Sequence, residues 1–176
     1  MRFVVIGTSG SGKSTFAKTF ANTCGVTYVE LDELFWAPNW TPHPTEVFKE
    51  RVVAATEPER WVVDGNYSVV RAVLWPKATD IVWLNFSRFT VFSRILRRTV
   101  MRAITRQDLW AGNKESLLRA FLSKDSILLW SFSTFRKNQV KFATLRASAE
   151  FSHLNWHELR TPAEAKRFLH AQKHDV

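Results

Sequence analysis

The chain has 176 residues, 45% of them hydrophobic and 23% charged, so it is long enough for one compact domain and too apolar to be disordered. Lys and Arg number 25 against 16 for Asp and Glu; the resulting net charge of +9 favours polyanionic partners such as nucleotides or nucleic acid. The one cysteine excludes an intramolecular disulfide, and no apolar run approaches the roughly 18 residues that span a membrane. We therefore expect a single cytoplasmic domain without a signal peptide.

Short apolar segments, rich in β-branched and aromatic residues, are typical of parallel strands that are buried on both faces. We expect such strands at 3–6, 27–31, 61–63, 81–84 and within 151–156. Helices are expected at 13–21, 45–55, 68–75, 88–106, within 115–147 and from Pro162 onward, with a loop at 38–44. The alternation predicts an α/β fold of three layers, with a five-stranded parallel sheet and ligands at the carboxyl ends of its strands.

The segment from Gly7 to Ser14 matches the phosphate-binding pattern G-x-x-x-x-G-K-[ST], and it lies between a predicted strand and a predicted helix. Such a loop points backbone N–H groups at phosphate oxygens, and the helix adds its positive end. We expect Lys13 to reach the β- and γ-phosphates of ATP and the Ser14 hydroxyl to bind Mg²⁺. The residues predicted to bind the nucleotide are Gly7, Ser9, Gly10, Ser11, Gly12, Lys13, Ser14 and Thr15.

A phosphate-binding loop occurs in small-molecule kinases, in GTPases and in motor or nucleic-acid ATPases. A small GTPase should carry an Asn-Lys-x-Asp stretch, but Asn113-Lys114 is followed here by Glu115-Ser116. Motor and helicase domains are usually longer than this chain. The length and the motif therefore favour a compact phosphotransferase.

Three further segments carry recognisable motifs: LDELFWAPNW over 31–40, WVVDGNY over 61–67 and RILRR over 94–98. Together with GTSGSGKST near the N-terminus, they resemble the adenylate-kinase-like small P-loop kinases. More specifically, they resemble the bacterial proteins labelled DNA topology modulation protein. The similarity covers most of the chain and weakens beyond about Asn113. It implies a P-loop NTPase fold with a helical lid, and ATP with Mg²⁺ as cofactors.

In adenylate-kinase-like proteins the lid begins with a helix that carries two arginines four residues apart, one against the adenine ring and one at a phosphate. Arg94 and Arg98 match this spacing, so the resemblance implies that both bind ATP and stabilise the transferring group. We expect an arginine-rich lid over about 94–120, in a region without acidic residues between Asp80 and Asp108. The alternatives are a solvated basic helix face and a nucleic-acid contact.

Two carboxylates end predicted strands at the same edge of the sheet. Asp64 is predicted to hold Mg²⁺ together with Ser14, the alternative being a helix cap. Asp32 follows the second strand, where relatives that phosphorylate hydroxyl groups use a carboxylate to bind or deprotonate the acceptor. A nucleoside monophosphate needs no such base. In adenylate kinases the segment after Asp-Gly carries a Phe-Pro-Arg motif, whose arginine binds the acceptor phosphate. Asn66-Tyr67 stands in its place here, which counts against AMP as the acceptor.

The sequence thus predicts a magnesium-dependent, ATP-binding phosphotransferase whose catalytic residues are Lys13, Asp32, Arg94 and Arg98. Its acceptor would be a nucleotide, a nucleoside or another small molecule, covered by the segment at about 34–58. Aromatic residues expected near that acceptor, for stacking or for packing, are Trp36, Trp40 and Tyr67. The alternative is a nucleotide-binding regulatory protein that affects DNA topology. The family label and the positive charge favour that alternative, but no helix-turn-helix or zinc-finger pattern supports it.

Overall fold

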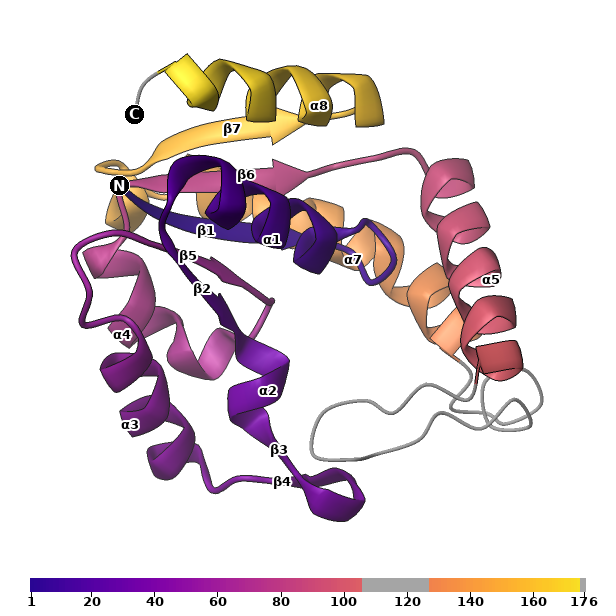
Figure 1. Ribbon diagram of the computed structural model, residues 1–176, viewed down its shortest axis with the longest axis horizontal. Helices are drawn as coiled ribbons and strands as arrows, with labels where there is room; N and C mark the ends of the chain where they lie inside the picture. Colours follow the sequence, from indigo (N-terminus) through magenta and orange to yellow (C-terminus); the bar gives the residue numbers. More distant parts are fainter. Residues whose placement is uncertain (106–126, 175–176) are drawn as a thin grey trace.

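The computed structural model describes residues 1–105 and 127–174, and a five-stranded parallel sheet forms its centre (Figure 1). The strands are β1 (Arg2–Gly7), β2 (Thr27–Glu30), β5 (Trp61–Asp64), β6 (Asp80–Leu84) and β7 (Asn155–Leu159). Their order is β2-β5-β1-β6-β7 and all neighbours pair in parallel. The carboxyl ends of the strands therefore meet at one edge, and the chain changes direction across the sheet at β1. Ligands of open α/β sheets bind at such a point.

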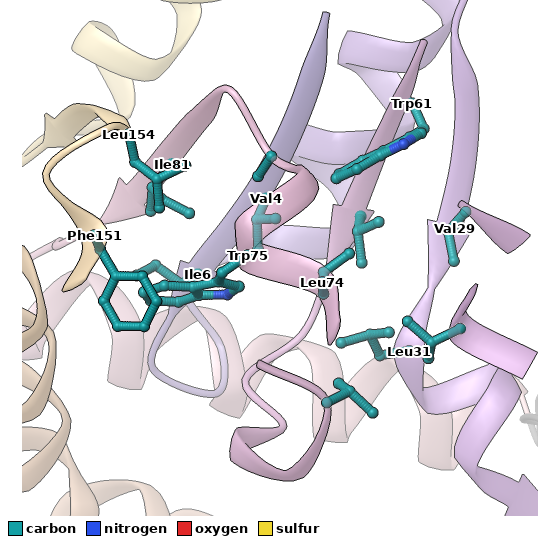
Figure 2. Packing of buried hydrophobic residues seen from close by; sticks show 14 of the residues in the cluster. Val4, Ile6, Val29, Leu31, Trp61, Leu74, Trp75, Ile81, Phe151 and Leu154 are labelled. Atoms are coloured by element: carbon teal, nitrogen blue, oxygen red, sulfur yellow. The ribbon is translucent and has the colours of Figure 1, made fainter. Parts of the chain in front are cut away.

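Helices cover both faces of the sheet. The main helices are α1 (Lys13–Cys24), α3 (Thr45–Ala55), α4 (Arg71–Leu74), α5 (Arg88–Thr105), α7 (Ile127–Ala147) and α8 (Pro162–Ala171). Within β1, Val4 and Ile6 face a core that includes α3, α4 and part of α7, shown in Figure 2. Phe3 and Val5 face a second core with α1, α8 and part of α5. Burial on both faces explains why the strands are continuously apolar, and each such side chain contributes about 1.5–3 kcal/mol.

Between β2 and α3 the chain forms α2 (Leu31–Phe35) and a small antiparallel hairpin, β3 (Trp36–Ala37) with β4 (Thr41–Pro42). The remaining elements are short 3-10 helices: η1 (Pro38–Trp40), η2 (Ser68–Val70), η3 (Trp75–Lys77), η5 (Ala149–Phe151) and η6 (Gln172–His174). In Figure 1, α7 runs behind the sheet, and its end that reaches the carboxyl ends of the strands packs against α5, which lies beyond them. The hairpin and these two helices thus border the edge where a ligand is expected.

The predicted α/β fold with its five-stranded parallel sheet is confirmed, with local corrections. The last strand lies at 155–159 and not at 151–156, because Phe151 turns into the core and packs edge-on against Trp75, with ring centroids 4.8 Å apart. The expected loop at 38–44 contains the tip and second strand of the hairpin. Of the predicted lid at 94–120, the first part lies in α5, and 106–120 lie outside the described residues. In the described part of the chain, no helix is both long and apolar enough to cross a membrane.

Candidate active site

The predicted phosphate-binding loop joins the end of β1 to the start of α1. Gly10 has a φ of 81° and Gly12, the N-cap of α1, has a φ of 89°. Only glycine adopts this left-handed conformation without strain. The Ser11 N–H donates a hydrogen bond to the Thr8 carbonyl at 3.0 Å, which closes a tight turn inside the loop. The backbone therefore has the coiled form that lets successive N–H groups surround a phosphate.

Two side chains of the loop fit a bound triphosphate. The Lys13 ammonium donates to the carbonyl oxygens of Gly7 at 3.0 Å and Thr8 at 3.4 Å, so it lies against the loop. The Ser11 hydroxyl is buried and has no hydrogen-bond partner among the residues that the structure describes. A buried, unpaired hydroxyl costs about 1–3 kcal/mol, and a phosphate oxygen would satisfy it. The loop thus fits the nucleotide that the motif predicts.

Asp64 joins the end of β5 to the first turn of α1. The Ser14 hydroxyl donates to its Oδ2 at 2.6 Å, and the Tyr28 hydroxyl donates to its Oδ1 at 3.0 Å. Asp64 is only 4% exposed, and burial raises the pKa of its carboxyl to about 6. The Ser14 hydrogen bond lowers this pKa, whereas Glu30, paired with Asp64 in the sheet, raises it. The oxygens of Ser14 and Asp64 are ligands of the kind that Mg²⁺ prefers, directly or through water.

The turn after Asp64 is tied to the phosphate-binding loop. Gly65 has a φ of 141°, and a Cβ there would lie 2.8 Å from the Leu31 Cβ, so no larger residue fits. The Asn66 Nδ2 donates to the Gly7 carbonyl at 2.6 Å, and the Gly7 N–H donates back to the Asn66 Oδ1 at 3.3 Å. This reciprocal pair holds the start of the loop against the end of β5. The sequence analysis did not identify it, because the two residues are 59 positions apart.

Asp32 lies at the same edge, although not where a strand ends. β2 stops at Glu30, and Asp32 is the second residue of α2. The Tyr67 hydroxyl donates to its Oδ1 at 2.5 Å. Burial and the nearby Asp32 carboxylate raise the pKa of Tyr67, so its hydroxyl stays protonated. The turn that follows β5 therefore contacts the phosphate-binding loop through Asn66 and Asp32 through Tyr67.

Arg94 brings α5 to the loop. Its Nη1 donates to the Ser11 carbonyl at 2.6 Å, and its guanidinium lies 4.9 Å from the centre of the Phe86 ring. Burial lowers the pKa of Arg94 from its ordinary value. The Arg98 backbone belongs to α5, but its side chain lies outside the described residues. Arg94 thus lies against the predicted phosphate-binding loop, and its contact with ATP stays a prediction.

The remaining predicted residues are distributed as follows. Ser9 lies in the loop, and Thr15 is exposed in the first turn of α1. Trp36 and Trp40 contact each other edge to face, with ring centroids 5.5 Å apart, at the hairpin. Within 1–105 and 127–174, no group of three or more His, Cys, Asp or Glu side chains is arranged to hold a metal. Mg²⁺ in phosphate-binding sites usually has only one or two protein ligands, so this pattern is compatible with Ser14 and Asp64.

No protein-family model matches the sequence, and no curated protein is significantly similar to it. Among solved structures, the fold is similar to that of a gluconokinase from Sinorhizobium meliloti 1021. The TM-score is 0.52 at 17% sequence identity, and the match covers 99% of this chain and 94% of that chain. This similarity confirms the P-loop kinase type of α/β fold. The more specific resemblance to DNA topology modulation proteins stays a prediction.

Proposed function

We propose that the protein is an ATP- and magnesium-dependent phosphotransferase that phosphorylates a hydroxyl group of a small acceptor. The observation that carries this proposal is the position of Asp32. Its carboxylate lies at the same sheet edge as the phosphate-binding loop, and Tyr67 and Asn66 connect the two through adjacent residues. A carboxylate at this edge, separate from the Ser14–Asp64 pair, is suited to bind the hydroxyl of an acceptor.

On the nucleotide side, the backbone of the loop, Lys13 and Arg94 would bind the phosphates of ATP. Lys13 would exchange its carbonyl partners for the β- and γ-phosphates, and Arg94 would bring positive charge from α5. Ser14 and Asp64 would hold Mg²⁺, which neutralises negative charge on the phosphate oxygens when it is bound. Because phosphoryl transfer needs mainly positioning and charge stabilisation, these residues suffice for the nucleotide half of the reaction.

On the acceptor side, Asp32 would accept the proton of the attacking hydroxyl. A bond forms between the acceptor oxygen and the γ-phosphorus, the bond from that phosphorus to the bridging oxygen breaks, and ADP leaves. A carboxylate favours a hydroxyl acceptor over an anionic phosphate acceptor, because like charges repel. The Phe-Pro-Arg motif of AMP kinases is also missing after Gly65. The name of the gluconokinase with the similar fold agrees with a kinase activity.

The direct test is incubation with ATP, Mg²⁺ and a panel of nucleosides, nucleoside monophosphates and sugars, with ADP and the phosphorylated product detected by mass spectrometry. We expect ADP formation that requires a hydroxyl acceptor. Phosphorylation of nucleoside monophosphates alone would refute the hydroxyl acceptor. ADP formation that needs no acceptor and is stimulated by duplex DNA would instead favour a regulatory ATPase.

The role of Asp32 is tested with Asp32→Asn, which keeps the size of the side chain and removes its charge. We expect turnover to fall about 100-fold or more while ATP affinity is retained. Glu33→Gln, at the exposed neighbouring position, is the matched control and should keep full turnover. Equal losses of ATP affinity and turnover in Asp32→Asn would place Asp32 on the metal side.

A further inference from the structure

We propose that Tyr67 is a positioning residue that orients the Asp32 carboxylate toward the acceptor. This inference rests on the proposed function, because it assigns to Tyr67 a task within the same site. Tyr67 would determine which oxygen of Asp32 meets the acceptor and how far that oxygen lies from the phosphate-binding loop.

The first argument is the hydrogen bond itself. A phenol has one O–H donor, and Tyr67 uses it on Oδ1 of Asp32 at 2.5 Å. It is the one hydrogen bond to the Asp32 side chain among the described residues. Oδ1 thus already accepts one hydrogen bond, whereas Oδ2 keeps both lone pairs for the acceptor's hydroxyl. Without this bond, the carboxylate could rotate about its last torsion, which is broad and soft.

The second argument is that Tyr67 is itself held in place. Its ring packs against Phe35 and Phe48, with centroid distances of 4.7 and 5.1 Å. Burial and Asp32 raise the pKa of the Tyr67 hydroxyl, whereas its interaction with the Trp36 side chain lowers it. An indole N–H can only donate, so it leaves the Tyr67 O–H to donate to Asp32. This interaction links the β3–β4 hairpin to Tyr67.

The third argument is the connection to the nucleotide. The two residues before Tyr67 are Gly65, which allows no Cβ against Leu31, and Asn66, which bonds to Gly7 in both directions. The Tyr67 backbone is thereby anchored to the phosphate-binding loop. Because a displacement of about 1 Å can slow a reaction by about 100-fold, this anchoring sets the distance from Asp32 to the transferred phosphate.

The test is Tyr67→Phe, which keeps the ring and its packing and removes only the hydroxyl. We expect kcat to fall about 10- to 100-fold with the acceptor that the panel identifies, the KM for ATP to stay the same, and the Tm to remain within about 5 °C of the wild type. In the Asp32→Asn background the same substitution should have no further effect, since Tyr67 acts through Asp32. Additive losses, a matching rise in the KM for ATP, or wild-type turnover would each overturn the proposal.

Two further variants sharpen the test. Tyr28→Phe makes the same change at the only other tyrosine of the sequence, which donates to Asp64. It should change the Mg²⁺ dependence of turnover. Its effect should be the same in the wild type and in the Asp32→Asn background, because Tyr28 does not act through Asp32. Trp36→Phe removes the indole N–H that interacts with the Tyr67 hydroxyl. It should lower kcat less than Tyr67→Phe does, and only when Asp32 is present. If Tyr67→Phe does not fold, Trp36→Phe decides.

An activity-independent measurement separates this proposal from the proposed function. If no acceptor in the panel is phosphorylated, the proposed function fails, and crystal structures of the wild type and Tyr67→Phe then test the positioning alone. We expect the Asp32 carboxylate to change its orientation, or to occupy several orientations, when the Tyr67 hydroxyl is absent. An unchanged single orientation would overturn the positioning role.

Discussion

The Ser14 hydroxyl donates a 2.6 Å hydrogen bond to the Asp64 carboxylate and so joins the first turn of α1 to the carboxyl end of β5. The carboxylate is nearly fully buried and lies beside Glu30 in the sheet. Burial and this second carboxylate disfavour its charged form, whereas the hydrogen bonds from Ser14 and Tyr28 favour it. A divalent cation bound here would favour the charged form further. Protonation, metal binding and stability are therefore linked at Asp64.

This linkage predicts an unusual pH dependence for the metal-free protein. The pKa of Asp64 is about 6 in the folded state against 3.8 for an ordinary Asp, so the folded state binds the proton more tightly than the unfolded state does. The contribution of Asp64 to stability should fall as pH rises from about 4 to 6 and stay reduced above 6, by about 3 kcal/mol at 1.36 kcal/mol per pKa unit. Asp64→Asn should lack this fall. Urea unfolding in EDTA between pH 4 and 8 measures the difference.

Asp80 is the matched control, because its shift has the opposite sign. Burial would raise its pKa, but hydrogen bonds from His157, at 2.8 Å, and from Thr79 hold the pKa below its usual range. The stability that Asp80 contributes is present at neutral pH and is lost as pH falls through its lowered pKa. Asp80→Asn should therefore remove an acid-labile contribution. If Asp64→Asn and Asp80→Asn shift the pH profile in the same direction, the raised pKa of Asp64 is wrong.

Lys13→Ala should abolish most nucleotide-dependent activity. In the proposed function the Lys13 ammonium binds the β- and γ-phosphates, and removing a charge-stabilising group of this kind costs about 100- to 1000-fold in turnover. Calorimetric titration with ATP and an ADP-release assay measure binding and turnover. Lys49→Ala is the control for ATP binding, since the ion pair that the described residues give Lys49 is a surface pair with Glu46 at 2.9 Å. ATP binding by Lys13→Ala at wild-type affinity would contradict the assignment of the loop.

The part of the site that sequence predicts well is the part set by local pattern. The loop from Gly7 to Ser14 has fixed spacing, and strands buried on both faces have an apolar run that ends where polar residues begin. That reasoning placed Asp64 at a strand end, beside the first turn of α1. It failed at Asp32, because the apolar Leu31 extends the strand pattern although the chain already turns into α2 there.

The contacts that complete the site lie beyond such reasoning. Asn66 meets Gly7 and Tyr67 meets Asp32 because β5 lies between β2 and β1 in the sheet. Strand order is not encoded in the periodicity of any one segment, so these partners have no local signal. The resemblance identified Arg94 as a site residue. It could not predict the partner of Arg94, because that partner is the backbone carbonyl of Ser11, which any residue would supply. Tyr67 was predicted near the acceptor, but its contact with Asp32 and that of Asn66 with Gly7 could be predicted only with the correct strand order.

Arg94→Lys should weaken ATP binding although the charge is kept. The planar guanidinium both donates to the Ser11 carbonyl and lies over the Phe86 ring, and an ammonium cannot reproduce this geometry. We expect the KM for ATP to rise about 10-fold, corresponding to the loss of one charged hydrogen bond. Arg97→Lys, at an exposed position of the same helix, should leave it unchanged. Equal effects of the two substitutions would show that only the net charge of α5 matters.

Gly10→Ala tests whether the loop needs its close contact with α5. A Cβ at Gly10 would lie 2.2 Å from Cγ1 of Ile95 and 3.2 Å from the carbonyl oxygen of Val91, in a backbone with a φ of 81°. Gly25→Ala is the matched control, because its φ of 61° is equally left-handed but nothing lies within 4 Å of the added carbon. Backbone strain alone costs about 1–2 kcal/mol in both variants. Gly10→Ala should therefore lose more stability in urea unfolding than Gly25→Ala, and it should also bind ATP more weakly, because α5 and Arg94 must move away from the loop. Equal ATP affinity in the two variants would mean that α5 does not need to contact the loop for nucleotide binding.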